Sequence, residues 1–374
     1  ILLLPVVSWG QKVLYVQSPD RKIELQVMIG QELEIAIIRN GTTVLQPSAI
    51  GMDVRFIGIL GENPKLKSVS RRSVTEKLSS PIYIKDEVDN IYNELTASFR
   101  GNYSVVFRCY NQGVAYRFVT DFKEREIVIN NEKAVFHFPS GTKGYAAYSN
   151  YGDDNDLSSQ YLNSFENTYD NQLLSLLNSR RLIFYPFLVE LPDKFEKICI
   201  TESDLRDYPG MFLQSSPDSF SMKGVWAPLP EKTVQGGHNQ LQQIVVKRYD
   251  YIAHTNGKRT FPWRIFTIAE QDRELLDNDL VYLLATPSVL KDISWIKPGK
   301  VAWDWWNDWN ISKVDFRAGI NNETYKYYID FAAINQIKYV ILDEGWAVNQ
   351  QADMLQVIPE IDLTELVSYA KSKN

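Results

Sequence analysis

The sequence contains few of the residues that bind transition metals or form cross-links. It has 2 cysteines and 3 histidines in 374 residues. Cys109 and Cys199 each lie in an apolar, strand-like segment outside any CxxC pair, so two buried free thiols are expected rather than a disulfide. No cysteine or glutamate stands at ligand spacing from a histidine, which argues against a histidine-based zinc site.

Long runs of one residue class are also missing. No segment approaches the ~18 consecutive apolar residues of a membrane-spanning helix. No run of five like charges occurs, and 46 acidic residues outnumber 40 basic ones to give a net charge of −6. We therefore expect no membrane span, and we expect the partner to be neither a nucleic acid nor an anionic membrane surface.

The first ten residues, ILLLPVVSWG, are apolar, do not begin with methionine, and end in small residues before a polar segment. This pattern predicts that residues 1–10 are the tail of a secretory signal peptide. The alternative is a buried first strand. The signal-peptide interpretation predicts a periplasmic or secreted protein.

Short segments of alternating polarity, rich in Val, Ile, Tyr and Phe, fill the chain from Lys12 to about Leu290. Turn signals such as SPD, NG and PSG separate them, as expected for strands. Examples are KIELQVMI, YSVVFRCY, QIVVKRY and LVYLLA. Residues 11–290 are therefore predicted to form a β-super-sandwich of two large packed sheets. The 13% aromatic content fits such a core, or alternatively stacking on a ringed ligand.

The pattern changes after Pro287. A linker is followed by a strand (VAWDWW), a helix (NNETYKYYIDFAAINQI), an apolar strand (KYVILDEGW) and a second helix (IDLTELVSYAKSKN). This order predicts a βαβα unit of a buried parallel sheet. Asp362 is the expected N-cap of the second helix. The apolar stripe of the first helix is expected at Tyr325, Tyr328, Ile329, Ala332 and Ala333. Two strands and two helices are too few to close a barrel, so residues 291–374 are expected to begin a domain that continues beyond Asn374.

Polar and aromatic residues follow both predicted strands, where parallel α/β folds bind their ligands. Carboxylate and amide groups can hydrogen-bond sugar hydroxyls while an indole packs on the C–H face of the ring, so a sugar site is predicted. An ordinary loop with solvated charges is the alternative for Asp343 and Glu344. The predicted substrate-binding residues are Asp304, Trp306, Asn307, Asp343, Glu344 and Trp346.

Two features bear on how these residues act. Asp343 and Glu344 are neighbours in sequence and should point to opposite faces, whereas a glycosidase needs two facing carboxylates ~5–5.5 Å or ~6.5–9.5 Å apart. We interpret them as substrate-holding rather than catalytic. In the first strand, Trp303 and Trp305 should alternate with Asp304 and Trp306, so that one set packs on helices and the other faces the site.

Five stretches of the chain together resemble glycoside hydrolase family 97. These are QSPDRKIEL, ITESDLRDYPGMFL, RTFPWRIFTIAE with NDLVYLLATPS, VAWDWWNDWN and YVILDEGW. The resemblance implies an exported, calcium-dependent α-glycosidase with an N-terminal super-sandwich, a (β/α)8 TIM barrel and a small C-terminal β-domain. WDWWNDWN and LDEGW are more similar to the retaining α-galactosidase branch than to the inverting α-glucosidase branch. LDEGW also resembles the DD[CG]W motif of related α-galactosidase barrels, with Glu344 in place of the second aspartate.

The resemblance also implies an α-linked oligosaccharide substrate and a catalytic pair on later barrel strands, so no catalytic residue is expected in this chain. The family's calcium has one ligand from the sandwich, for which Glu166 in NSFENTYD is the candidate, with a solvated loop carboxylate as the alternative. The acidic segment YGDDNDLSS, residues 151–159, competes with it but lacks the full EF-hand pattern. A non-catalytic carbohydrate-binding β-sandwich is the alternative function from another class.

Overall fold

The computed structural model describes residues 12–79, 82–161, 166–192, 196–217, 219–351 and 353–373. The predicted signal-peptide tail, residues 1–10, lies outside these ranges. The chain divides into two compact units. The first, here the sandwich unit, contains the chain up to Glu231 and Lys247–Ser288; the second, here the βα unit, contains Lys232–Val246 and Val289–Asn374.

The sandwich unit is built from antiparallel strands, as the period-2 alternation predicted. Its first strands are β1 (Lys12–Gln17), β2 (Ile23–Ile29), β3 (Leu33–Arg39), β4 (Thr42–Val54), β5 (Gly58–Leu60), β6 (Leu66–Ser79), β7 (Glu87–Phe99), β8 (Tyr103–Tyr110) and β9 (Gly113–His137). The others are β10 (Lys143–Tyr148), β11 (Asp170–Leu173), β12 (Ile183–Glu190), β13 (Lys197–Ser203), β14 (Met211–Ser215), β15 (Ser221–Trp226), β18 (Ala253–Thr260) and β19 (Trp263–Ala269). Two short 3₁₀ helices, η1 (Leu157–Gln160) and η2 (Leu174–Leu176), lie between strands.

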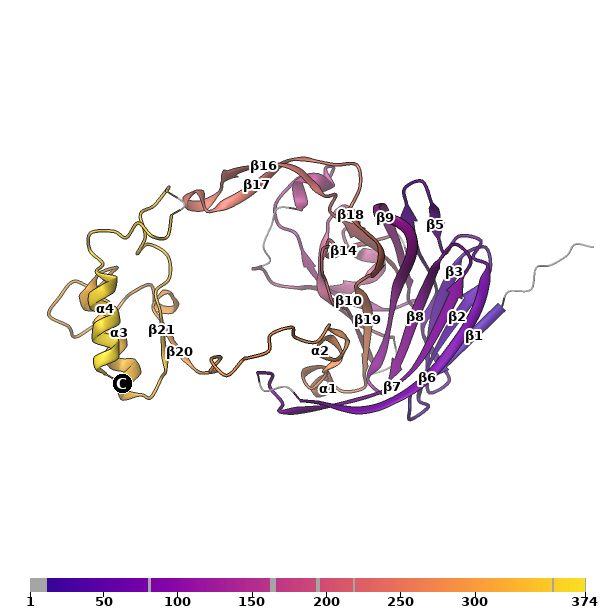
Figure 1. Ribbon diagram of the computed structural model, residues 1–374, viewed down its shortest axis with the longest axis horizontal. Coiled ribbons are helices and arrows are strands. Elements are labelled where there is room, and N and C mark those ends of the chain that lie inside the picture. Colours follow the sequence, from indigo (N-terminus) through magenta and orange to yellow (C-terminus); the bar gives the residue numbers. More distant parts are fainter. Residues whose placement is uncertain are drawn as a thin grey trace, which may run out of the picture. The chain divides into compact units, whose positions relative to one another are not determined.

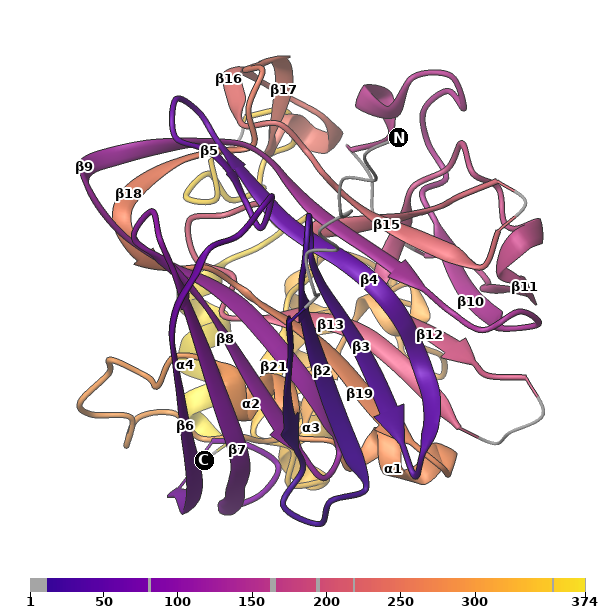
Figure 2. The same cartoon turned by 90° about the vertical axis from the view of Figure 1, so that its right-hand side faces the viewer.

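The long strand β9 joins two series of paired strands. Its first half pairs with β8 and β19, in the series β6-β7-β8-β9-β19-β13-β12-β10-β11. Its second half pairs with β4 and β15, in the series β1-β2-β3-β4-β9-β15-β14. Strands β2, β3 and β4 of the second series lie side by side in Figure 2. Because β9 belongs to both series, the sandwich is one continuous hydrogen-bonded sheet.

The core of the sandwich contains a buried charged cluster around Arg264. Every residue of β19 is buried, and one of them is Arg264. Its guanidinium pairs with Glu132 at 2.7 Å and also with Glu202, and Tyr208 donates a hydrogen bond to Glu132 at 3.1 Å. Buried charges persist in a core when they are paired and hydrogen-bonded in this way. Both cysteines are free, with Cys109 in β8 buried and Cys199 in β13 half-buried.

Two short helices, α1 (Asp272–Leu276) and α2 (Leu280–Leu284), close the sandwich unit. The prediction of a strand at LVYLLA was therefore wrong. Asn278 accepts a hydrogen bond from the backbone N–H of Leu280 at 3.0 Å, which starts a helical turn. Leu280, Leu283 and Leu284 then fall at i, i+3 and i+4 and are buried together, as the face of a helix requires.

A second difference concerns QIVVKRY, which was expected to be a sandwich strand. It lies in β17 (Gln242–Arg248), which pairs only with β16 (Pro230–Gly236) within the described chain. The turn between them contains a 3₁₀ helix, η3 (His238–Gln240). This β16–β17 hairpin is mostly exposed, and its residues Lys232–Val246 belong to the βα unit.

The rest of the βα unit follows the predicted order. Strand β20 (Val301–Trp303) and strand β21 (Tyr339–Ile341) are parallel, and α3 (Asn322–Ile334) connects them. Helix α4 (Leu363–Ser372) follows, capped by Asp362, which accepts a hydrogen bond from the backbone N–H of Glu365 as predicted. Figure 1 shows α3 and α4 beside β20 and β21.

The apolar stripe of α3 packs inside this unit. Tyr325 and Ile329 contact Ile361 and Leu366, and Tyr328 and Ala332 contact Ala302 of β20. Ala333, which was expected on the same stripe, is exposed. Among the described residues, no helix is long and apolar enough to cross a membrane.

Candidate sugar-binding site

Strands β20 and β21 are parallel, so their carboxyl ends meet at one edge of the sheet. Asp304 follows β20 directly, and Asp343 follows β21 after one residue. The backbone N–H of Asp343 lies 3.3 Å from both carboxylate oxygens of Asp304. The structure therefore brings together the two acidic segments that the sequence placed at these strand ends.

Asp304 is fully buried and acts as an acceptor for both loops. It receives hydrogen bonds from the backbone N–H of Trp305 at 2.7 Å and from the indole N–H of Trp309 at 3.0 Å, besides that of Asp343. Burial and then the neighbouring Asp304 carboxylate raise the pKa of the Tyr325 hydroxyl well above its ordinary value. Asp304 was predicted to contact substrate, but its side chain has no exposed surface. It instead accepts hydrogen bonds from the segments that follow β20 and β21.

Asp343 is half-buried, and protein donors fix its carboxylate. The indole N–H of Trp303 donates to Oδ2 at 2.5 Å, and the backbone N–H of Glu344 donates to Oδ1 at 2.7 Å. A carboxylate still has free lone pairs after accepting two hydrogen bonds. Asp343 is therefore oriented before a ligand binds and can still accept from a hydroxyl group.

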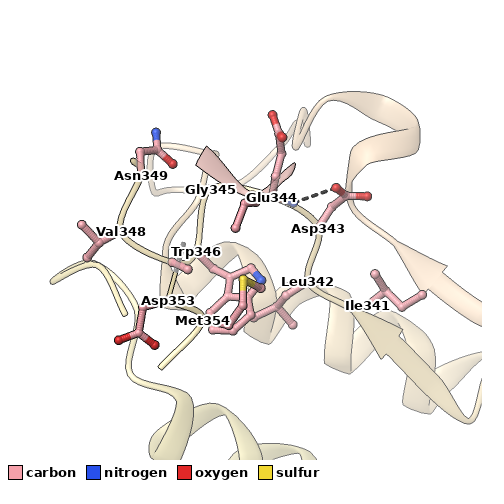
Figure 3. A pocket seen from close by; sticks show the side chains of 12 residues that line it. Ile341, Leu342, Asp343, Glu344, Gly345, Trp346, Val348, Asn349, Asp353 and Met354 are labelled. Carbon is pink, nitrogen blue, oxygen red and sulfur yellow. Dashed lines mark hydrogen bonds between the residues drawn. The ribbon is translucent and has the colours of Figure 1, made fainter. Parts of the chain in front are cut away.

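A cavity of about 310 Å³ lies against the loop that follows β21. This is at the lower end of the ~300–1,000 Å³ typical of small-molecule sites. Three predicted residues, Asp343, Glu344 and Trp346, line it (Figure 3). The other lining residues include Leu241, Val348, Asn349, Asp353 and Met354. The cavity thus combines an indole and other apolar side chains with carboxylates and an amide.

The two neighbouring carboxylates in this cavity do not face each other. In Figure 3 the Asp343 and Glu344 side chains point in different directions. Glu344 is exposed, and its Oε2 lies 2.9 Å from Nε2 of His238 in the β16–β17 hairpin. Asp343 and Glu344 therefore do not form the facing pair of carboxylates that a glycosidase needs.

The remaining predicted residues, Trp306 and Asn307, lie in the short 3₁₀ helix η4 (Trp305–Asn307) and do not line the cavity. Asn307 accepts a hydrogen bond from the Tyr328 hydroxyl at 2.6 Å and donates to the carbonyl of Asn310 at 2.5 Å. Trp306 is 83% exposed. Its ring centroid lies 6.0 Å from that of Trp303.

The predicted alternation of side chains from Trp303 to Trp306 was wrong. The strand ends at Trp303, and Asp304 adopts a helical backbone conformation. The reason is local, because the Asp304 carboxylate caps the N–H of Trp305 and turns the chain.

Among the residues of this region that sequence reasoning missed, three make contacts that bear on the cavity. Trp303 was expected only to alternate along a strand, yet its N–H orients Asp343. His238 and Leu241 were not assigned to the sugar site, because they lie about a hundred residues before Glu344 in a segment predicted to belong to the sandwich. No local sequence signal indicates such a pairing.

Glu166, the candidate calcium ligand, is exposed. The described ranges contain no group of three or more His, Cys, Asp or Glu side chains placed to hold a metal ion. The competing segment 151–159 is held by its own turn: Asp156 accepts from the backbone N–H of Ser158 at 2.9 Å, and Asp154 pairs with Arg181 at 2.5 Å. An exposed carboxylate such as Glu166 has the oxygen chemistry that calcium prefers, but it supplies one ligand of the six to eight that are typical.

Comparison with known proteins identifies the family. The model of the glycosyl-hydrolase 97 N-terminal domain matches residues 16–287, and the model of glycoside hydrolase 97 matches residues 305–374. The chain belongs to glycoside hydrolase family 97. The resemblance seen in the five sequence stretches is thereby confirmed.

Three relatives illustrate the similarity. The chain is 50% identical over 365 residues to a retaining alpha-galactosidase of Bacteroides thetaiotaomicron, covering 98% of this chain and 55% of that protein. It is 24% identical over 372 residues to a probable retaining alpha-galactosidase of Streptomyces bingchenggensis, covering 95% of this chain and 50% of that protein. Its fold is similar to that of a family 97 enzyme from Pseudoalteromonas sp. strain K8 solved with acarbose, with a TM-score of 0.76, 22% identity, and coverage of 96% of this chain and 53% of the other. The chain spans about half the length of the curated relatives it matches.

Proposed function

We propose that this chain is part of an exported retaining α-galactosidase, which cleaves terminal α-galactosidic bonds, and that it supplies the sugar-holding side of the active site. The observation that carries the proposal is the cavity against the loop that follows β21, lined by Asp343, Glu344 and Trp346. The identity of 50% to a retaining alpha-galactosidase over nearly the whole chain supports the choice of substrate.

The chemistry of the cavity suits a galactosyl residue. Galactose has an axial hydroxyl at C4 and an apolar patch of C–H groups on one ring face. Asp343, held by Trp303, is oriented to accept a hydrogen bond from a sugar hydroxyl, and Glu344 can accept another. Trp346 presents an indole for packing on the apolar ring face. These residues bind and orient the sugar, and their fixed geometry lowers the cost of reaching the reactive pose.

We further propose that β20, α3, β21 and α4 are the first two βα units of a (β/α)8 barrel. Strands of a barrel are buried on both faces. In the described chain, Val301, Trp303, Tyr339 and Ile341 of β20 and β21 are 38–45% exposed. This apolar strand surface is what further βα units would cover.

In the proposed reaction, two facing carboxylates on later strands act as nucleophile and acid/base, with retention of configuration. The residues of this chain do not perform those steps. They hold the galactosyl ring while the glycosidic bond breaks through an oxocarbenium-like state. A calcium ion, with Glu166 as one oxygen ligand, would supply positive charge that orients the site.

The test uses the full-length polypeptide encoded by the gene. It is expected to hydrolyse p-nitrophenyl α-galactoside, and proton NMR of the first product is expected to show the α-anomer of galactose. Release of glucose from the α-glucoside analogue, with the β-anomer first, would favour the alternative of an inverting α-glucosidase. Binding of α-galactosides without turnover would favour the carbohydrate-binding alternative.

Export is tested separately. The apolar character of residues 1–10 supports it. Fractionation of the native host is expected to place the mature protein in the periplasm or the medium. Its presence in the cytoplasm, with these residues retained, would contradict the proposal.

A further inference from the structure

The β16–β17 hairpin leaves the sandwich unit and joins the unit that carries the cavity. In sequence it lies between β15 and β18, and both of these strands pair with β9. Its residues Lys232–Val246 nevertheless belong to the βα unit. The side chains of β16 are exposed with the exception of the half-buried final glycine, so the hairpin has little core of its own.

The turn of this hairpin contacts the loop that lines the cavity. His238 Nε2 lies 2.9 Å from Glu344 Oε2, and Leu241 is one of the residues that line the cavity. Both members of the pair remain accessible, with side chains 66% and 48% exposed. A ligand in the cavity would therefore meet the hairpin as well as the loop after β21.

Glycines set the backbone of both contacting segments. Gly237 precedes His238 with φ of 72°, and Gly345 follows Glu344 with φ of 99°. A side chain at Gly237 would collide with Gln242, and one at Gly345 would collide with Ile320. The conformations that place His238 and Glu344 are thus ones that other residues adopt only with strain.

We propose that the turn of the β16–β17 hairpin completes the sugar-binding pocket. His238 is a positioning residue that holds the Glu344 carboxylate where it accepts a hydroxyl of the bound galactoside. Leu241 supplies an apolar wall for the group attached to the galactosyl residue. This inference rests on the proposed function, because it assigns the hairpin to the same pocket.

The physical basis is preorganisation. A glutamate on an exposed loop samples several rotamers, and fixing one of them on binding costs entropy. Pairing with His238 restricts Glu344 before the sugar arrives. Since exposed ion pairs are individually weak, the effect of removing His238 should be modest and should appear in binding more than in the chemical step.

The sandwich unit offers a matched control. His254 Nε2 lies 3.3 Å from Glu126 Oε2, with side chains 46% and 60% exposed. This is a second exposed histidine–glutamate pair, and neither member lines the cavity. His254→Ala therefore removes the same kind of interaction at a place where the proposal predicts no consequence for binding.

The experiment measures steady-state kinetics of the full-length protein on p-nitrophenyl α-galactoside and on melibiose. His238→Ala is expected to raise KM by about two- to fivefold with little change in kcat, and His254→Ala to leave both unchanged. His238→Gln, which keeps a hydrogen-bond donor, should restore part of the loss. Leu241→Asn should raise KM more for the aryl galactoside than for melibiose, because the aryl group is apolar.

A double-variant cycle shows whether His238 acts through Glu344. If it does, adding His238→Ala to Glu344→Gln has no further effect on KM. If the wild-type protein is active and the His238→Ala and His254→Ala variants have the same KM, this inference is overturned and the proposed function still stands. A wild type that neither hydrolyses nor binds α-galactosides overturns the proposed function, and the inference with it.

Discussion

The indole N–H of Trp303, the last residue of β20, donates a 2.5 Å hydrogen bond to the carboxylate of Asp343, which follows β21. On the other side, the backbone N–H of Asp343 points at Asp304. Two residues of the first strand end therefore fix one residue of the second. The orientation of Asp343 depends on these contacts, and the predictions that follow start from them.

Trp303→Phe should weaken substrate binding. The change keeps an aromatic ring and removes the N–H donor to Asp343. Hydrogen bonds to charged groups contribute about 1.5–3 kcal/mol, so KM for α-galactosides should rise about tenfold or more. Trp295→Phe is the control, because Trp295 lies in the linker and is 69% exposed. An unchanged KM would mean that Asp343 needs no donor from β20.

Asp304→Asn should destabilise the βα unit. The substitution replaces an acceptor oxygen by an NH₂ group among N–H donors in a fully buried site. A buried polar group without a partner costs about 1–3 kcal/mol, which denaturant unfolding can measure. Asp308→Asn is the control: Asp308 is exposed with φ of 53°, a conformation that asparagine tolerates. Equal stability of the two variants would contradict the connecting role of Asp304.

Asp343→Asn and Glu344→Gln should lower kcat/KM without altering its pH profile. Each removes a charged acceptor from the cavity, with an expected loss of about 10- to 100-fold. Both limbs of the pH profile should stay in place, because the proposed reaction assigns proton transfer to other carboxylates. Disappearance of either limb would identify the altered residue as the catalytic acid or base.

Glu202 should make the stability of the sandwich depend on pH. Burial raises its pKa from an ordinary value of 4.5 to about 7, although Arg264 opposes the shift. Between these values the folded protein keeps a proton that the unfolded chain has released. The free energy of unfolding should therefore fall as pH rises from about 4.5 to about 7. Above the folded-state pKa, the stabilisation from this proton is fully lost.

Glu202→Gln should remove that contribution, whatever its effect on overall stability. Denaturant midpoints measured across the same pH window test this, with the exposed Glu62→Gln as the control. If stability depends on pH in the same way in the wild type and in Glu202→Gln, the pKa of Glu202 does not change on folding.

Calcium should support activity, and Glu166→Gln should raise the calcium concentration needed for half-maximal activity. Chelation is expected to lower turnover and the melting temperature, because an ion bound only by the folded state stabilises it. Asp154→Asn tests the competing acidic segment and should leave the calcium dependence unchanged, since Asp154 already pairs with Arg181. Activity that is insensitive to EDTA would remove calcium from the proposal.

Much of the fold could be predicted because several sandwich strands bury one face more deeply than the other. In β8, for example, buried and half-buried residues alternate, and YSVVFRCY shows that alternation directly. LVYLLA failed because a short apolar run fits a strand and a buried helical turn equally well. In the structure the backbone N–H of Leu280 donates a hydrogen bond to the Asn278 side chain, which favours the helical turn. The apolar pattern of the segment does not encode this hydrogen bond.

The site was predictable in part for a similar reason. Asp343, Glu344 and Trp346 follow an apolar strand, where the rule for parallel strands predicts a ligand site, and all three line the cavity. Asp304 follows the same rule but is buried, because the neighbouring N–H groups turn toward its carboxylate. Leu241 reaches the cavity and His238 reaches Glu344 through contacts between segments far apart in the sequence, which a local pattern does not encode.

The course of the chain around the β16–β17 hairpin affects how the protein can be taken apart. The polypeptide passes between the two units three times, after Glu231, after Val246 and after Ser288. Cleavage of the linker after Ser288 would leave His238 and Leu241 on the N-terminal fragment and Glu344 on the C-terminal fragment, so neither fragment alone would contain all the residues that line the cavity. For the same reason, a domain exchange that replaced the sandwich as one continuous segment would also replace the β16–β17 hairpin, and with it Leu241, which lines the cavity of the βα unit.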